Sequence, residues 1–168
     1  MKLLPTDVVR DQIDTFRDGR DDGRSLQDFL IFYFIPLVFG LLVGFFGAEK
    51  FDIAAILASV AVFTGLIFNL AFNIFDKSLQ MRRDPFQSAD RDAIQLVEEL
   101  RANVNYTVLV GIVLTGTLAT SLFFDMPNDW TIVTRVGNGL IAALLLHMLF
   151  MSGMVLKRFT ILHGVLKP

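Results

Sequence analysis

The sequence predicts an all-α polytopic membrane protein with four transmembrane helices. Its composition is 54% hydrophobic and includes 17 Phe residues against a single Trp. Four apolar stretches interrupt the charged parts of the chain, and at about 1.5 Å rise per residue each is long enough to cross a hydrocarbon core of roughly 30 Å. The expected spans are residues 29–48, 53–75, 106–124 and 132–156. They form a transmembrane domain of residues 26–168, which follows an N-terminal arm of residues 1–25.

The basic residues predict the orientation of the four spans. Of the 15 Lys and Arg residues, all but Lys50 and Arg135 lie before the first span, in the middle connection 76–105, or after the fourth span. Cytoplasmic loops of membrane proteins are enriched in Lys and Arg. We therefore expect a multi-pass protein of a bacterial inner membrane with both termini and the middle connection in the cytoplasm.

The N-terminal arm has the pattern of an amphipathic helix between Thr6 and Arg24. Acidic and basic side chains alternate every three or four residues, and Val9, Ile13 and Phe16 share the opposite face. The apolar face predicts contact with the protein's own surface, with the lipid interface, or with a partner. The acidic face disfavours a lipid anchor, since anionic headgroups would repel it. The residues expected to bind a cytoplasmic protein are Asp7, Arg10, Asp11, Asp14, Arg17, Asp18 and Asp21.

The middle connection, residues 76–105, is expected to form a helical hairpin. The second span has no helix breaker before Asp84 and Pro85, and a residue that precedes proline is disfavoured in a helix. After this turn, Ala93, Val97, Leu100 and Val104 recur at helical spacing and lead into the third span. The hairpin is either an extended turn or a stalk that transmits a signal.

Small residues at spacings of three and four mark the helix faces that pack closely. In membranes such residues let helix backbones approach one another. They predict contacts within the bundle or a homo-oligomer interface, for which the first span is the leading candidate. The residues are Gly40, Gly44, Ala54, Ala58, Ala61 and Gly65. Pro36, also in the first span, is expected to kink the helix or to free a backbone carbonyl.

Polar side chains within the spans need partners, because an unpaired polar group in hydrocarbon is costly. The intramembrane polar residues are Asn69, Asn73, Arg135, Asn138 and His147. They predict interhelical hydrogen bonds that fix the bundle, or a polar strip of Asn69, Asn73 and His147 along an ion or water path. A proton or metal site at His147 is a third possibility, but its span has no second ligand at metal-binding spacing.

The sequence does not predict an enzyme. It has no cysteine and no recognisable catalytic triad or phosphate-binding loop, so no cofactor or metal is expected. Its net charge of −2 gives no basic surface for nucleic acid.

The layout of four spans, cytoplasmic termini, short outer turns and charged cytoplasmic helices resembles small membrane subunits of bacterial anti-phage defence systems. These include the membrane subunit of the Kiwa system and transmembrane CRISPR accessory proteins. The resemblance implies an inner-membrane oligomer that senses envelope disturbance or opens a pore and works with a cytoplasmic effector. Two hypotheses follow: a scaffold or sensor that binds a cytoplasmic partner, and a small ion channel or transporter. The scarcity of charge within the spans favours the first.

Overall fold

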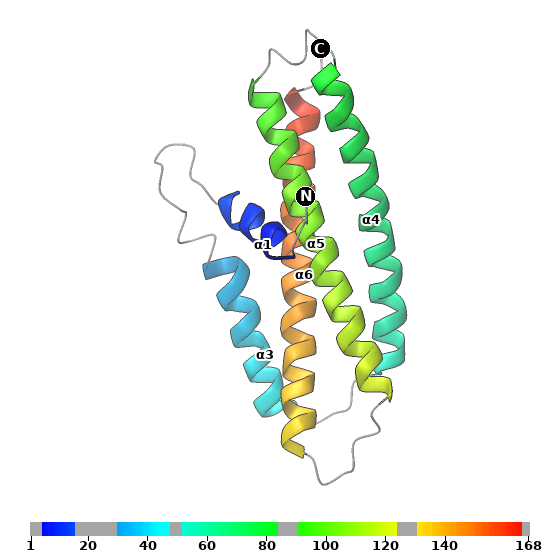
Figure 1. Cartoon of the computed structure of the whole chain (residues 1–168). Coiled ribbons are helices and arrows are strands. Elements are labelled where there is room, and N and C mark those ends of the chain that lie inside the picture. Colours follow the sequence, from blue (N-terminus) through cyan, green and yellow to red (C-terminus); the bar gives the residue numbers. More distant parts are fainter. Residues whose placement is uncertain (1–4, 16–29, 48–51, 84–90, 124–130, 166–168) are drawn as a thin grey trace. The chain divides into compact units, whose positions relative to one another are not determined.

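The computed structural model describes residues 5–15, 30–47, 52–83, 91–123 and 131–165, and each regular element within them is a helix. Three of these helices are long and the others are short, as Figure 1 shows. In chain order they are α1 (Pro5–Asp14), the π-helix η1 (Leu30–Phe34), α3 (Ile35–Phe46), α4 (Ile53–Arg83), α5 (Arg91–Phe123) and α6 (Thr131–Val165).

The three long helices are long and apolar enough to cross a membrane. The segments that qualify are Ile53–Met81, Ile94–Phe123 and Ile132–Leu162. They indicate a membrane protein in contact with a lipid bilayer. The first expected span corresponds to η1 and α3, whose five and 12 residues would extend about 25 Å by helix rise. Both ends of that expected span, residues 29 and 48, lie outside the described residues, so a fourth span stays a prediction.

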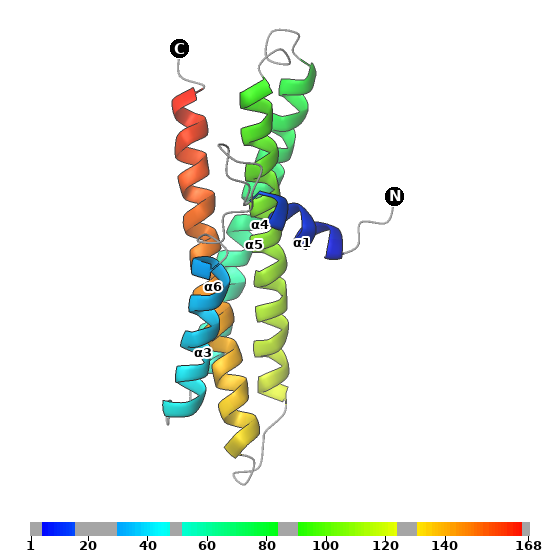
Figure 2. The same cartoon turned by 90° about the vertical axis from the view of Figure 1, so that its left-hand side faces the viewer.

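The chain divides into two compact units, and each long helix contributes one segment to each unit. The first, which we call the α1 unit, contains α1, α4 from Gly65 onward, α5 as far as Leu109, and α6 from Met151 onward. The second, the α3 unit, contains η1, α3 and the remaining segments of α4, α5 and α6. Figure 2 gives the second view of these helices.

The core of the α1 unit is built from the apolar positions that the middle connection was expected to align. Val97, Leu100 and Val104 of α5 are at most 2% exposed, and they pack with α4 and α6. The buried residues of this core are Ile74, Met81, Val97, Leu100, Val104, Val155 and Leu162. Helix α6 therefore extends beyond the expected end of the fourth span at residue 156, and its Leu162 packs in the same core as the connection.

The middle connection is described on both sides of its expected turn. Helix α4 reaches Arg83, directly before Asp84 and Pro85, and α5 runs from Arg91 into the apolar segment without a break. Residues 84–90, where the turn of the hairpin was expected, lie outside the described residues, so the hairpin stays a prediction.

Candidate interaction site at the N-terminal helix

Helix α1 is short and is held by contacts with the rest of the α1 unit. Pro5 opens the helix, where its missing N–H is no loss, and Asp7 in the first turn complements the helix dipole. At the other end, the N–H and the hydroxyl of Thr15 both donate to the carbonyl of Gln12, at 3.1 and 2.7 Å. The helix has no basic residue in its last turn. Its C-terminal carbonyls therefore favour a cation from elsewhere in the chain.

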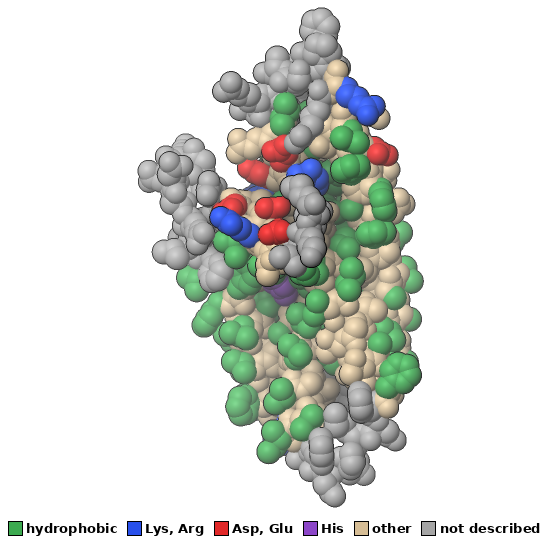
Figure 3. Space-filling view, viewed as in Figure 1, with side chains coloured by type: hydrophobic (Ala, Val, Ile, Leu, Met, Phe, Trp, Pro, Cys, Tyr) green, Lys and Arg blue, Asp and Glu red, His purple; other side chains and the backbone are tan. Residues whose placement is uncertain are grey.

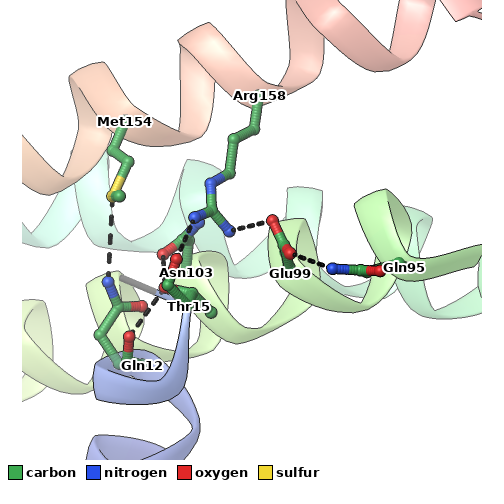
Figure 4. A network of polar contacts seen from close by, with 7 residues as sticks. All are labelled: Gln12, Thr15, Gln95, Glu99, Asn103, Met154 and Arg158. Atoms are coloured by element: carbon green, nitrogen blue, oxygen red, sulfur yellow. Dashed lines mark hydrogen bonds and ion pairs between the residues drawn. The ribbon is translucent and has the colours of Figure 1, made fainter. Parts of the chain in front are cut away.

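Arg158 of α6 supplies that cation. Its Nη2 donates to the carbonyl of Thr15 at 2.9 Å, and its Nη1 lies 3.2 Å from Oε2 of Glu99 on α5. Gln95, one turn earlier on α5, donates to the other carboxylate oxygen of Glu99 at 3.0 Å. The Arg158 side chain is only 11% exposed. A largely buried guanidinium thus connects α1, α5 and α6, as Figure 4 shows.

Gln12 is the one fully buried side chain among the described residues of α1. Its Nε2 donates to the sulfur atoms of Met151 and Met154 on α6, at 3.6 and 4.0 Å. Figure 4 shows the second of these contacts. Thioether sulfur is a weak acceptor, and Oε1 of Gln12 has no hydrogen-bond partner among the described residues. The apolar positions Val9 and Ile13, which we expected to be the contact face, are only half-buried. The buried contact of α1 with the rest of the α1 unit is therefore made by a polar residue, Gln12, whose hydrogen-bonding capacity is only partly used.

Asn103 of α5 completes the contact with α1. Its Oδ1 lies 3.3 Å from the hydroxyl of Thr15, and its side chain is fully buried. The next turn of α5 carries Thr107, also buried, whose hydroxyl donates to the backbone carbonyl of Asn103 at 2.7 Å. Polar groups at this depth are worth more when they are paired, because water does not compete for them.

The outer face of α1 is charged. Asp7, Arg10 and Asp11 are exposed, and Asp14 is half-buried. In Figure 3 acidic and basic side chains gather around α1, among predominantly apolar and uncharged surface. The other members of the expected partner-binding set, Arg17, Asp18 and Asp21, lie outside the described residues.

His147 occupies a separate site, within the α3 unit. Its Nδ1 lies 2.8 Å from the carbonyl oxygen of Phe32, and its ring lies 5.0 Å from the ring of Tyr33. Phe32 is four residues before Pro36, which has no N–H to donate to the helix backbone. The bond of His147 to the Phe32 carbonyl places the proton on Nδ1, because a carbonyl only accepts.

The remaining intramembrane polar residues have more open surroundings. Asn69 and Asn73 are exposed on α4 in the α1 unit, whereas His147 is buried in the α3 unit. On α6, Arg135 is exposed and Asn138 is half-buried.

The small residues fall into two groups. A Cβ at Gly40 would meet the carbonyl oxygen of Gly139 on α6 at 2.5 Å, and a Cβ at Gly44 would meet the carbonyl oxygen of Arg135 at 3.1 Å. Gly40 and Gly44 thus pack α3 against α6 within one chain. The small residues of α4, in contrast, are largely turned outward. Ala54, Ala58, Ala61 and Gly65 are all exposed, and a Cβ at Gly65 would have no heavy atom within 4 Å.

Within the described residues, no group of three or more His, Cys, Asp or Glu side chains could hold a metal ion. Comparison with known proteins found no matching family model, no matching curated protein and no matching solved structure.

Sequence reasoning missed the residues that hold α1 in place. The sequence patterns assign no role to Gln12, Glu99, Asn103 or Arg158. A signal was present for Asn103, because it lies one position before Val104 on the buried side of α5, next to Leu100. A polar residue on an apolar face indicates a buried partner.

Proposed function

We propose that this chain is a scaffold or sensor subunit of a membrane complex, and that the charged outer face of α1 binds a cytoplasmic protein. The subunit assembles as a homo-oligomer in a bacterial inner membrane. A role in anti-phage defence or stress signalling is proposed from the layout expected from the sequence, which resembles that of small defence subunits.

The observation that carries this proposal is the division of α1 into a fixed side and a charged side. Gln12 and Thr15 hold the helix to α5 and α6, while Asp7, Arg10 and Asp11 are exposed. Fixed charges of both signs give a surface whose complementarity selects one partner and disfavours others. A helix that anchored the chain to anionic lipid would instead present basic side chains around its apolar face.

The contacts of α1 also support a topology in which the charged segments lie together on the cytoplasmic side of the membrane. Helix α1 bonds to Asn103 and Arg158, which belong to the ends of α5 and α6 that the positive-inside rule places in the cytoplasm. Arg158 lies 143 residues from Thr15 in sequence. Their hydrogen bond fits a topology in which the N-terminal arm and the C-terminal end of α6 lie on the same side of the membrane.

The exposed face of α4 is the surface that best supports homo-oligomerisation. Ala58, Ala61 and Gly65 leave room for the backbone of a neighbouring helix. Asn69 and Asn73 continue along the same helix with exposed amides, and an amide can both donate to and accept from the same amide on another copy. Such interhelical bonds contribute about 0.6 kcal/mol each.

A channel built on the polar strip has less support. Asn69 and Asn73 are exposed on a single chain, so they could line a path only if several copies surrounded it with these faces inward. His147 already donates to the carbonyl of Phe32.

Charge reversal on α1 tests the proposed function. Asp7→Lys with Asp11→Lys should abolish co-purification of the partner from cells, because both positions are exposed and the substitutions invert their charge. Asp76→Lys, the same change at an exposed site on α4, is the matched control and should retain the partner. Retention of the partner by the α1 variant would contradict the proposal, provided that the variant inserts into the membrane as the wild type does.

A further inference from the structure

An apolar groove of about 400 Å³ lies between α3 and α6 within the α3 unit. Its walls are large apolar side chains that include Leu37 and Leu41 of α3 and Val136 and Leu140 of α6. All four side chains are about half exposed or more. The volume falls in the range of roughly 300–1,000 Å³ that is typical of small-molecule sites.

Glycine creates the groove. Gly40 and Gly139 bring the backbones of α3 and α6 into contact, since a Cβ at Gly139 would lie 2.7 Å from the carbonyl oxygen of Gly40. Both glycines line the groove, together with Gly44 and Ala143. The floor of the groove is therefore backbone, while larger side chains rise on either side.

Arg135 is the one charged residue that lines the groove. It is exposed and lies in the second turn of α6, four residues after the helix begins at Thr131. Among the described residues no carboxylate forms an ion pair with it. A guanidinium at the end of a membrane-crossing helix extends toward the headgroups, where phosphate is the complementary anion.

We propose that this groove binds one phospholipid, with an acyl chain along the glycine floor and the lipid phosphate on Arg135. The groove follows α6 from Ile132 to Ala143, which is about 16 Å by helix rise, and Arg135 lies one turn from its Ile132 end. This length accommodates the upper part of an acyl chain below its headgroup. The apolar lining fits the acyl chain, and the single cation near one end fits the phosphate.

The charge of the lining favours a phospholipid over a helix from a second copy. The groove is lined by apolar residues and one cation, Arg135, and by no carboxylate. The complementary occupant therefore carries an anion next to an apolar chain, which is the chemistry of a phospholipid.

Native mass spectrometry of the full-length protein in detergent tests this proposal with two lipids that share their tails. Dioleoylphosphatidylglycerol carries a phosphate, and dioleoylglycerol does not. We expect the wild type to bind one phosphatidylglycerol about tenfold more tightly than dioleoylglycerol, because a hydrogen bond to a charged group has about this strength. Arg135→Gln should bind both lipids equally. Val136→Trp should weaken both about tenfold by filling the groove, and Val133→Trp, which is exposed on α6 outside the lining, should behave as the wild type.

An Arg135→Gln variant that keeps the preference for phosphatidylglycerol would overturn the proposal, as would a Val136→Trp variant that binds lipid as the wild type does. A change in oligomer mass with Val136→Trp would assign the groove to a second copy instead. If Val136→Trp does not fold, Leu140→Trp fills the same groove and replaces it in the comparison.

Discussion

His147 Nδ1 lies 2.8 Å from the carbonyl oxygen of Phe32, a residue that precedes Pro36 by four positions. The two residues are 115 positions apart in sequence and join η1 to α6 within the α3 unit. The edge-to-face contact of Phe32 with Phe150, 6.1 Å between ring centroids, lies beside this bond. Proline is tolerated in membrane helices where neighbouring groups bond to the backbone that its ring disrupts. His147 makes such a bond to the turn that precedes Pro36.

This relationship predicts that His147 and Pro36 are coupled. His147→Leu should lower the free energy of unfolding by roughly 1–3 kcal/mol, since it removes the hydrogen bond that the imidazole makes with the Phe32 carbonyl in an apolar setting. In a Pro36→Ala background the same substitution should be less destabilising, because the alanine introduced there offers its own N–H to the Phe32 carbonyl. The double-mutant cycle, measured by reversible unfolding in detergent, should give a coupling energy of at least about 0.5 kcal/mol. Equal losses in both backgrounds would contradict this assignment.

Gln12 should limit how stably α1 packs against the rest of the α1 unit. Gln12→Leu removes a buried carbonyl that has no partner among the described residues and keeps apolar volume against Met151 and Met154. We expect slower hydrogen exchange of the α1 amides, with a gain of about 1–2 kcal/mol. Gln12→Ala removes the volume as well and should speed exchange. Slower exchange with Ala, or faster exchange with Leu, would show that the amide has a partner of its own.

The two classes of small residue should respond differently to an added methyl group. Gly40→Ala should destabilise the chain by about 1–3 kcal/mol, because its Cβ would meet the Gly139 carbonyl oxygen at 2.5 Å and the Ala143 Cβ at 2.6 Å. Gly65→Ala has open space and should be neutral or stabilising by up to about 1 kcal/mol, since Gly is unfavourable inside a helix. Thermal unfolding in detergent distinguishes them, and equal losses would mean that Gly65 also packs within the chain.

The oligomer interface is expected on α4. Ala61→Leu combined with Gly65→Leu should yield a smaller species by native mass spectrometry with an unchanged helical content, because both positions are exposed in the single chain. Gly153→Leu on α6, where an added Cβ also meets open space, is the matched control and should leave the assembly intact. Loss of assembly with the control, or an intact oligomer with the α4 variant, would place the interface elsewhere.

The long helices could be predicted from the sequence. A long apolar segment in lipid must pair its own backbone N–H and C=O groups, and a helix does this. Pro36 and His147 were each recognised as features that need a hydrogen-bond partner. That each serves the other could not be predicted, since their pairing depends on how η1 packs against α6.

The α1 contacts were less predictable for a related reason. The periodicity of the arm favoured Val9 and Ile13 as its contact face, yet Gln12 is the residue that is buried. Periodicity identifies a face only to within about one residue on a helix with about 3.6 residues per turn. Gln12 is buried against Met151 and Met154, which lie far from it in sequence, and no local pattern specifies such contacts.

Site-specific photo-crosslinking in cells tests the central claim, that the charged face of α1 contacts a protein partner. A photoreactive amino acid at Asp7, Arg10 or Asp11 should give one crosslinked product containing the same second protein from each position. The same probe at Asp52, an exposed residue that the predicted topology places across the membrane, should not give that product. Crosslinks from position 52 to the same protein, or none from the three α1 positions in a correctly inserted chain, would contradict the account.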